Sequence, residues 1–171
     1  SLAGDTLTNH GEISSDGGLS IGQQDDPASA LLNRGLIASE GPALLSVEKV
    51  ENAQGATLQS QGDLTLINAD SLVNQGKVIG HGVLSLEAKT LLNERLADAP
   101  SGSHDGTLGG GEVLFVHGNE LVNRGGALLG STGDMTLLIR DRVENNRSDI
   151  VAHRHLFIGA QLPQTPQEGE E

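Results

Sequence analysis

Histidines are the side chains of this sequence most suited to binding a metal ion. His153 and His155 are separated by one residue, and on a strand both rings would point to one face, where they could bind a metal ion. The sequence offers no third ligand, so exposed positions at a corner of the chain are the favoured interpretation, and we expect no metal or cofactor. His104 followed by Asp105 lies in a Gly- and Ser-rich stretch and is a weaker candidate still.

Carboxylate pairs could act as general acid and base, but those in this chain fall in polar, loop-like stretches. Asp25-Asp26 and the C-terminal glutamates are examples. Enzymes that cleave polysaccharides on a β-helix line a groove with clustered acids, basic residues and aromatic side chains, and this chain has no Tyr or Trp. No G-x-S-x-G motif occurs, and Gly109-Gly110-Gly111 is expected to precede a strand, not to open a helix as a phosphate loop does. The sequence therefore predicts a non-enzymatic protein without a small-molecule substrate.

Composition narrows the class of partner. The formal net charge of −13 repels phosphate backbones, so we expect no nucleic acid partner. The chain has no cysteine, which excludes disulfides, thiolate metal sites and cysteine nucleophiles. Gly accounts for 24 of the 171 residues, while aromatic residues make up only 1%. Aliphatic residues separated by glycine are typical of many short strands joined by tight corners.

A repeated unit organises nearly the whole sequence. An apolar-x-Asn triplet recurs seven times, with successive asparagines separated by 24, 19, 22, 19, 30 and 22 residues. A glycine usually follows two residues later, then two apolar positions, a small residue with a second glycine, and a short alternating strand such as Leu84-Ser85-Leu86. The consensus is L-x-N-x-G-x-[LIV]-x-[SG]-x-G-x-L-x-[LIV]. The repeated asparagines are Asn9, Asn33, Asn52, Asn74, Asn93, Asn123 and Asn145.

This unit predicts an all-β solenoid. Each unit should hold three strands that are too short to form a sheet alone, and stacking the units would place equivalent strands side by side in parallel sheets around an aliphatic core. About seven coils are expected over residues 1–162. The seven asparagines would then stack in register as a structural ladder, each amide bonding to its neighbours along the axis.

Interruptions of the repeat are the places where a binding function would be expected, because solenoid insertions project as loops. The longer interruption spans residues 94–110 and the shorter one residues 22–30, and both are polar and rich in turn-forming residues. A tolerated insertion without a partner is one interpretation, and a binding loop is the other. Residues 163–171 are expected to be disordered. The candidate binding residues of the long interruption are Arg95, Asp98, Ser103, His104 and Asp105.

The consensus, seen clearly in LVNQGKVIGHGVLSLEAKTLLN, resembles the haemagglutinin repeats of two-partner secretion exoproteins. These include filamentous haemagglutinin adhesins and contact-dependent growth inhibition effectors, and the similarity covers about residues 2–160. It implies a right-handed parallel β-helix, exported by an outer-membrane transporter and held at the surface of a Gram-negative bacterium. The Asn-Pro-Asn motifs of the family's secretion domain are absent, and no family binding residue can be transferred.

Three functions remain open from the sequence. The first is a stalk segment of an adhesin or growth-inhibition effector, and we expect it to be an elongated monomer. The second is a module that binds a target-cell receptor or glycan through the 94–110 loop, which a loop folded into a defined platform would support. The third is a carbohydrate-active enzyme, which acids converging on one face would support.

Overall fold

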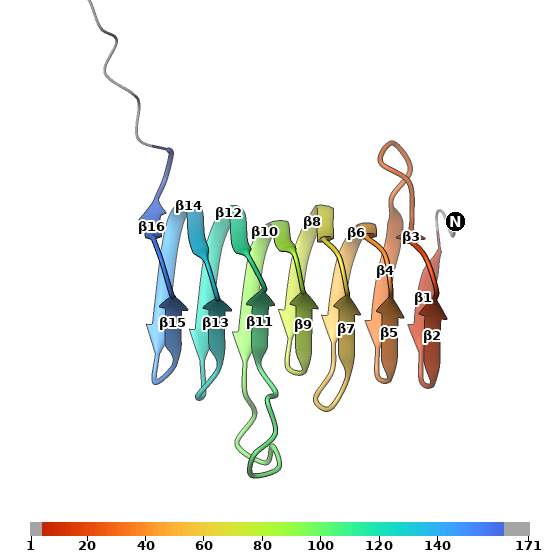
Figure 1. The fold of residues 1–171 in the computed structure, drawn as a ribbon, viewed down its shortest axis with the longest axis horizontal. Coiled ribbons are helices and arrows are strands. Elements are labelled where there is room, and N and C mark those ends of the chain that lie inside the picture. Colours follow the sequence, from red (N-terminus) through yellow and green to blue (C-terminus); the bar gives the residue numbers. More distant parts are fainter. Residues whose placement is uncertain (1–4, 163–171) are drawn as a thin grey trace, which may run out of the picture.

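Short strands separated by tight corners wind the chain into a solenoid, described over residues 5–162 of a computed structural model (Figure 1). Within these residues all regular structure is strand, and no helix capable of crossing a membrane is present. One set of strands has four residues each: β2 (Glu12–Ser15), β5 (Leu36–Ser39), β7 (Thr57–Ser60), β9 (Lys77–Gly80), β11 (Thr107–Gly110), β13 (Leu128–Ser131) and β15 (Asp149–Ala152).

A second set of strands covers the remaining sides of the solenoid. Most of its members have ten to thirteen residues and bend around one corner. In β10, the register with the preceding strand shifts between Leu86 and Ala88, which marks that bend. The set comprises β1 (Thr6–Asn9), β3 (Leu19–Ile21), β4 (Ala28–Asn33), β6 (Ala43–Asn52), β8 (Leu64–Asn74), β10 (Val83–Glu94), β12 (Val113–Arg124), β14 (Asp134–Asn146) and β16 (Leu156–Gly159).

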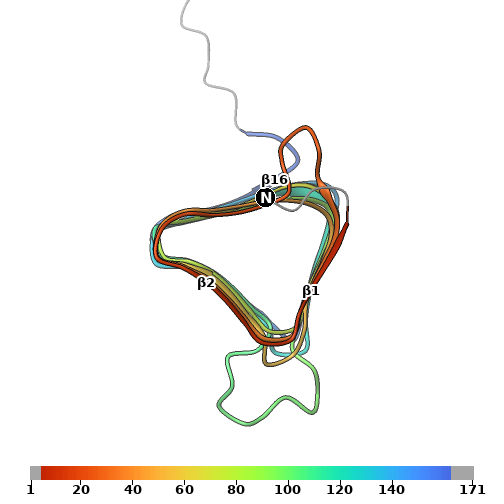
Figure 2. The same cartoon turned by 90° about the vertical axis from the view of Figure 1, so that its right-hand side faces the viewer.

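The strands form two parallel sheets that enclose a triangular cross-section (Figure 2). The short strands pair in the order β15-β13-β11-β9-β7-β5-β2, and the bent strands in the order β1-β4-β6-β8-β10-β12-β14-β16, with β3 on β6. Three separate strands per unit were expected; the bent strands instead pass through one corner without a break. Viewed from the N-terminal end, the chain turns clockwise as it recedes, which is a right-handed solenoid (Figure 2). The predicted parallel β-helix of about seven coils is confirmed.

In-register stacking gives the core its composition. Inward positions of successive coils face each other through the parallel pairing, so each core position becomes a column of aliphatic side chains. Leu31, Leu64, Leu84, Leu108 and Leu114 are among the fully buried members. In the last coil the equivalent core positions face no further strand in the described residues, and Leu156 and Ile158 are 48% and 47% exposed. Columns of stacked aliphatic side chains fill the core without aromatic side chains, which explains why aromatic residues make up only 1% of the sequence.

Seven asparagine side chains form a second kind of column at one corner. Consecutive members are linked from Nδ2 to Oδ1 at 2.8–2.9 Å through all six pairs from Asn9 to Asn145. From Asn9 to Asn123, the same Nδ2 also donates to the backbone carbonyl that opens the following coil's short strand, at 2.9–3.0 Å. The side chains from Asn33 to Asn123 are fully buried. We call this column the asparagine ladder.

Backbone contact at the corners explains the glycines. A Cβ on Gly35 would lie 2.0 Å from the carbonyl oxygen of Gly11 in the preceding coil, so no side chain fits there. The corner carbonyls meet amide groups of the next coil instead, as in the 2.9 Å bond from Leu36 N to Gly11 O. Close stacking at the corners therefore requires glycine for space.

Two segments leave the solenoid, and both are shorter than the sequence indicated. Ala28 begins strand β4 and Thr107–Gly110 is strand β11, paired in register with β9. The excursions are thus residues 22–27 and 95–106 (Figure 1). Gly109 and Gly110 belong to β11 and do not merely precede a strand, because their backbone continues the pairing of Ile79 and Gly80. Residues 163–171, expected to be disordered, lie outside the described residues.

Substituting the central ladder residue tests the ladder's contribution to stability. Asn74→Ala removes the acceptor of Asn52 Nδ2 and the donor of both Asn93 Oδ1 and Thr107 O, all in a buried corner. We expect the free energy of unfolding to fall by about 2–4 kcal/mol, measured by urea denaturation followed by circular dichroism. Asn145→Ala, at the exposed end of the ladder, is the matched control and should cost clearly less. Equal losses at the two positions would contradict a buried, cooperative ladder.

Candidate functional site

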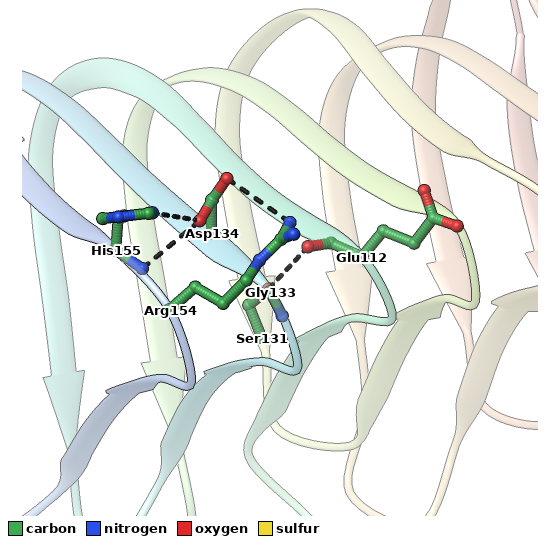
Figure 3. A network of polar contacts seen from close by, with 6 residues as sticks. All are labelled: Glu112, Ser131, Gly133, Asp134, Arg154 and His155. Atoms are coloured by element: carbon green, nitrogen blue, oxygen red, sulfur yellow. Dashed lines mark hydrogen bonds and ion pairs between the residues drawn. The ribbon is translucent and has the colours of Figure 1, made fainter.

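The His-x-His pair lies in a turn and not on a strand. His153, Arg154 and His155 join β15 to β16, and all three side chains are exposed. His155 Nδ1 lies 2.9 Å from Asp134 Oδ1 (Figure 3). The His153 ring makes no comparable contact with the rest of residues 5–162. Because the turn breaks the strand alternation, the two rings do not share a strand face. No group of three or more metal-ligating His, Asp or Glu side chains exists among residues 5–162.

Asp134 is the centre of a polar network at this corner (Figure 3). Its carboxylate accepts from the backbone N of His155 at 3.3 Å and pairs with Arg154 Nη2 at 3.4 Å. The arginine lies over Gly133, where a Cβ would be 2.8 Å from that same Nη2. Ser131 donates to the backbone carbonyl of Glu112 and accepts from Gly133 N, while the Glu112 carboxylate points away. The network joins turns of successive coils.

Electrostatics of the network are those of an exposed surface. The hydrogen bond with His155 and the nearby Arg154 hold the pKa of Asp134 below its usual value, against a smaller opposing effect of desolvation. Lys89 likewise lowers the pKa of Asp70 through a 2.5 Å contact. Both carboxylates are solvent-accessible, so these pairs contribute little to stability. The arrangement provides a structural ion pair at the corner and no nucleophile–base pair.

The long excursion, residues 95–106, is held by its own hydrogen bonds. Backbone turns close at Ala99 N to Leu96 O and at Ser103 N to Pro100 O, at 3.1 and 3.0 Å. Arg95 Nη2 donates to Pro100 O at 3.1 Å, which joins the start of the loop to its middle. These contacts give the loop a defined shape, the feature expected of a preorganised binding platform.

The five candidate residues of this loop differ in their exposure and contacts. Asp105 is only 5% exposed and accepts from Gly55 N at 3.3 Å, so it fastens the loop to the turn between β6 and β7. Ser103 has a buried Oγ without a hydrogen-bond partner. Arg95 is half-buried at the loop base, and only Asp98 and His104 are freely exposed. The five side chains therefore do not form one contact surface.

A cluster of arginines that the sequence analysis missed lies beside the loop base. Arg95, Arg124 and Arg147 line one cavity of about 370 Å³. The repeat carried part of the signal, because Glu94, Arg124 and Asn146 occupy equivalent positions just after three successive ladder asparagines. Aligning the coils at their asparagines places these three side chains in one row along the axis, but that row contains only one of the three arginines.

The acidic pair Asp25-Asp26 lies on the short excursion. Asp26 pairs with Gln23 through an isolated antiparallel bridge, and both aspartates are exposed. The shape is a small hairpin standing away from the sheets, visible near β4 in Figure 1.

Comparison with known families shows to which family the chain is related. The haemagglutinin repeat model matches residues 2–47, 38–125 and 97–147, which together cover most of the sequence. The chain belongs to the haemagglutinin repeat family. No curated protein and no solved structure matches it. The resemblance read from the asparagine-centred consensus is thereby confirmed.

Membership in the haemagglutinin repeat family indicates the general class of protein to which the chain belongs. Such repeats belong to filamentous haemagglutinin-like adhesins, so the chain is an adhesin-type segment of a secreted or cell-surface protein. Repeats of this kind are typically non-enzymatic stalks. The family's stacking architecture also explains why hydrogen-bonded columns, and not a pocket, dominate the structure.

The network around Asp134 predicts a pH effect of defined sign. A carboxylate whose pKa is lowered on folding stabilises the folded state above its unfolded pKa, and this stabilisation is lost as the pH falls through the folded pKa. NMR titration should therefore find the pKa of Asp134 below 3.8. In His155→Ala it should rise toward that value. His153→Ala, which removes a neighbouring ring without a contact to Asp134, is the control. A pKa that responds equally to both changes would contradict the assignment.

Proposed function

We propose that this chain is an extracellular stalk segment of a two-partner secretion protein, either an adhesin or a contact-dependent growth inhibition effector. In this role it is non-catalytic, crosses the outer membrane of a Gram-negative bacterium through a dedicated transporter, and holds other parts of its protein at a distance. The observation that carries the proposal is the unbroken asparagine ladder, linked through all six pairs at 2.8–2.9 Å.

Rigidity is what this ladder supplies. Hydrogen bonds along the axis, added to parallel backbone pairing on every side, resist bending between coils. A stalk needs this property, and it needs no pocket. The absence of cysteine and the short, locally paired coils also suit a chain that is exported unfolded and folds coil upon coil.

A second function is favoured by the order of the long excursion. In this alternative the module binds a target-cell receptor or glycan through residues 95–106. The loop is tied to the solenoid through Asp105 and Gly55, and a bond from Arg95 to Pro100 holds its first half, so binding would cost little loop-ordering entropy. A merely tolerated insertion does not require such contacts.

A loop deletion separates the two functions. Removing residues 95–105 leaves Asn93-Glu94-Gly106-Thr107, which matches the Asn74-Gln75-Gly76-Lys77 corner of the preceding coil. The ladder bonds of Asn93 to Asn123 and Leu128 do not involve the deleted residues, so the shortened chain should fold. Deleting Gln24 and Asp25 from the short excursion provides a matched control.

Fluorescently labelled chains would be bound to Gram-negative bacteria and to epithelial cells. The stalk function predicts no saturable binding to either, together with an elongated monomer by analytical ultracentrifugation for all variants. Saturable binding that disappears with residues 95–105 but survives the control deletion would replace the stalk function with the binding function. A compact or multimeric parent chain would contradict the rod-like stalk.

A further inference from the structure

Positive charge is concentrated at one corner of an otherwise acidic molecule. The chain carries ten Lys and Arg residues against 23 Asp and Glu residues. Three of those arginines line the cavity of about 370 Å³ beside the base of the long excursion, with Glu94 as the sole acid lining it. The cavity walls therefore hold an excess of two positive charges. Such a local reversal of charge attracts anions that the rest of the surface repels.

Three successive coils contribute one arginine each. Arg124 directly follows Asn123, whereas Arg95 and Arg147 each lie two residues after their ladder asparagines, Asn93 and Asn145. Glu94, Arg124 and Asn146 are paired in register, so the cavity runs along the axis at the corner outside the asparagine ladder. Leu96 and Ala97, at the start of the loop, give it one apolar wall.

Glycines make room for Arg95. A Cβ on Gly125 would lie 2.3 Å from Arg95 O, and the Cδ of Arg95 is the one neighbour within 4 Å of a Cβ built on Gly126. Both glycines have positive φ, 79° and 86°. The loop base thus rests on the corner of the next coil, where Arg95 N donates to Arg124 O at 3.1 Å. Arg95 is held at the cavity by its backbone and by Pro100 together.

Arg124 is oriented by a half-buried acid. Its Nε donates to Glu94 Oε1 at 2.9 Å, and the other oxygen of Glu94 accepts from Gln75 Nε2 at 3.2 Å. The Glu94 side chain is only 17% exposed, whereas that of Arg124 is 49% exposed. Glu94 engages only the Nε of Arg124, so the two Nη groups of the guanidinium keep N–H donors for a ligand.

Arg147 occupies a backbone conformation that other corners give to glycine. Its φ is +51°, at a corner where the preceding coil has Gly125 and Gly126. A non-glycine residue there costs free energy, and such strain persists mostly at functional positions. The side chain is exposed, and it has no hydrogen bond or ion pair with the rest of residues 5–162. Placing an unpaired arginine at this position completes the positive cavity.

We propose that the cavity lined by Arg95, Arg124 and Arg147 binds a carboxylate-bearing sugar, such as a uronic acid unit of a surface glycan. Planar guanidinium groups match a carboxylate through paired N–H donors. The side-chain amide of Asn146 suits sugar hydroxyls, and Leu96 with Ala97 suits the apolar face of the ring. A volume of about 370 Å³ is near the lower end of the range for small-ligand sites, which fits a saccharide unit better than a peptide segment.

This inference refines the second candidate function, the binding module, and rests on it only for its biological setting. Binding of a free sugar to the purified chain can be measured without any cell. Failure to bind the sugar while the 95–105 deletion still abolishes cell binding would remove this inference alone. If the parent chain binds the sugar but shows no saturable binding to cells, the binding function would be removed and this inference would remain.

Arg147→Gly is the sharpest variant, because glycine relieves the positive φ while the charge is lost. The 171-residue chain would be titrated with glucuronate by isothermal titration calorimetry, and the cavity residues followed by amide NMR shifts. We expect Arg147→Gly and Arg124→Gln each to weaken glucuronate binding at least about tenfold. The unfolding midpoint of Arg147→Gly should be unchanged or raised. Arg140→Gln, which makes the same change of charge at an exposed Arg140–Asp141 pair, is the matched control.

Four further ligands make the test decisive. Glucose, the neutral counterpart, should not bind, and a short glutamate peptide and inorganic phosphate should bind more weakly than glucuronate. Equal binding of phosphate would reduce the site to a general anion patch and overturn the proposal, and tighter binding of the peptide would replace the sugar with an acidic protein segment. N-acetylneuraminate serves as a second acidic sugar and should show the same dependence on Arg147. The proposal would also be overturned if neither Arg147→Gly nor Arg140→Gln changed the affinity for glucuronate.

Discussion

The amide of the buried asparagine is the group that every coil has in common. It has two donors and one acceptor oxygen, and leaving such a buried group without partners would cost about 1–3 kcal/mol. Its Nδ2 reaches both the next asparagine and the carbonyl that opens the next short strand, as Asn52 does with Asn74 and Lys77. These bonds can form only if each coil returns to the same corner in register. The ladder therefore fixes the register of the aliphatic columns, which by themselves would tolerate slippage along equivalent leucines.

The same constraint decides where the chain can vary. The excursion 95–106 leaves the solenoid two residues after Asn93 and returns at Thr107, so the ladder continues to Asn123 beneath it. Outside the ladder the corner is open to solvent, and positions that close stacking does not restrict to glycine can carry charged side chains. Charged residues can accumulate at such positions without disturbing the core. The arginines of the cavity and the Asp134 network both lie at corners of this kind.

Much of the architecture follows from residue spacing. The Asn-to-Asn distance of about 19 to 24 residues in most coils, the alternation in Leu84-Ser85-Leu86 and the corner glycines predict parallel coils around an aliphatic interior, as observed. The bend that joins two sides into single strands such as β10 was not predicted, because no glycine or proline interrupts the sequence Leu86–Ala88 where it occurs. The excursions were overestimated for the opposite reason. Thr107-Leu108-Gly109-Gly110 has turn-like composition, and parallel pairing with β9 overrides it.

The sequence by itself determined the family, the period, the inward positions and the identity of the ladder residues, because each of these is repeated in every coil and repetition is visible along one dimension. Only the tertiary structure decided which nonrepeated side chains meet. Asp105 turned inward to Gly55, His155 met Asp134, and Arg95, Arg124 and Arg147 came to one cavity from positions up to 52 residues apart. Their proximity depends on stacking along the axis, which places equivalent residues of successive coils about 4.8 Å apart whatever their separation in sequence.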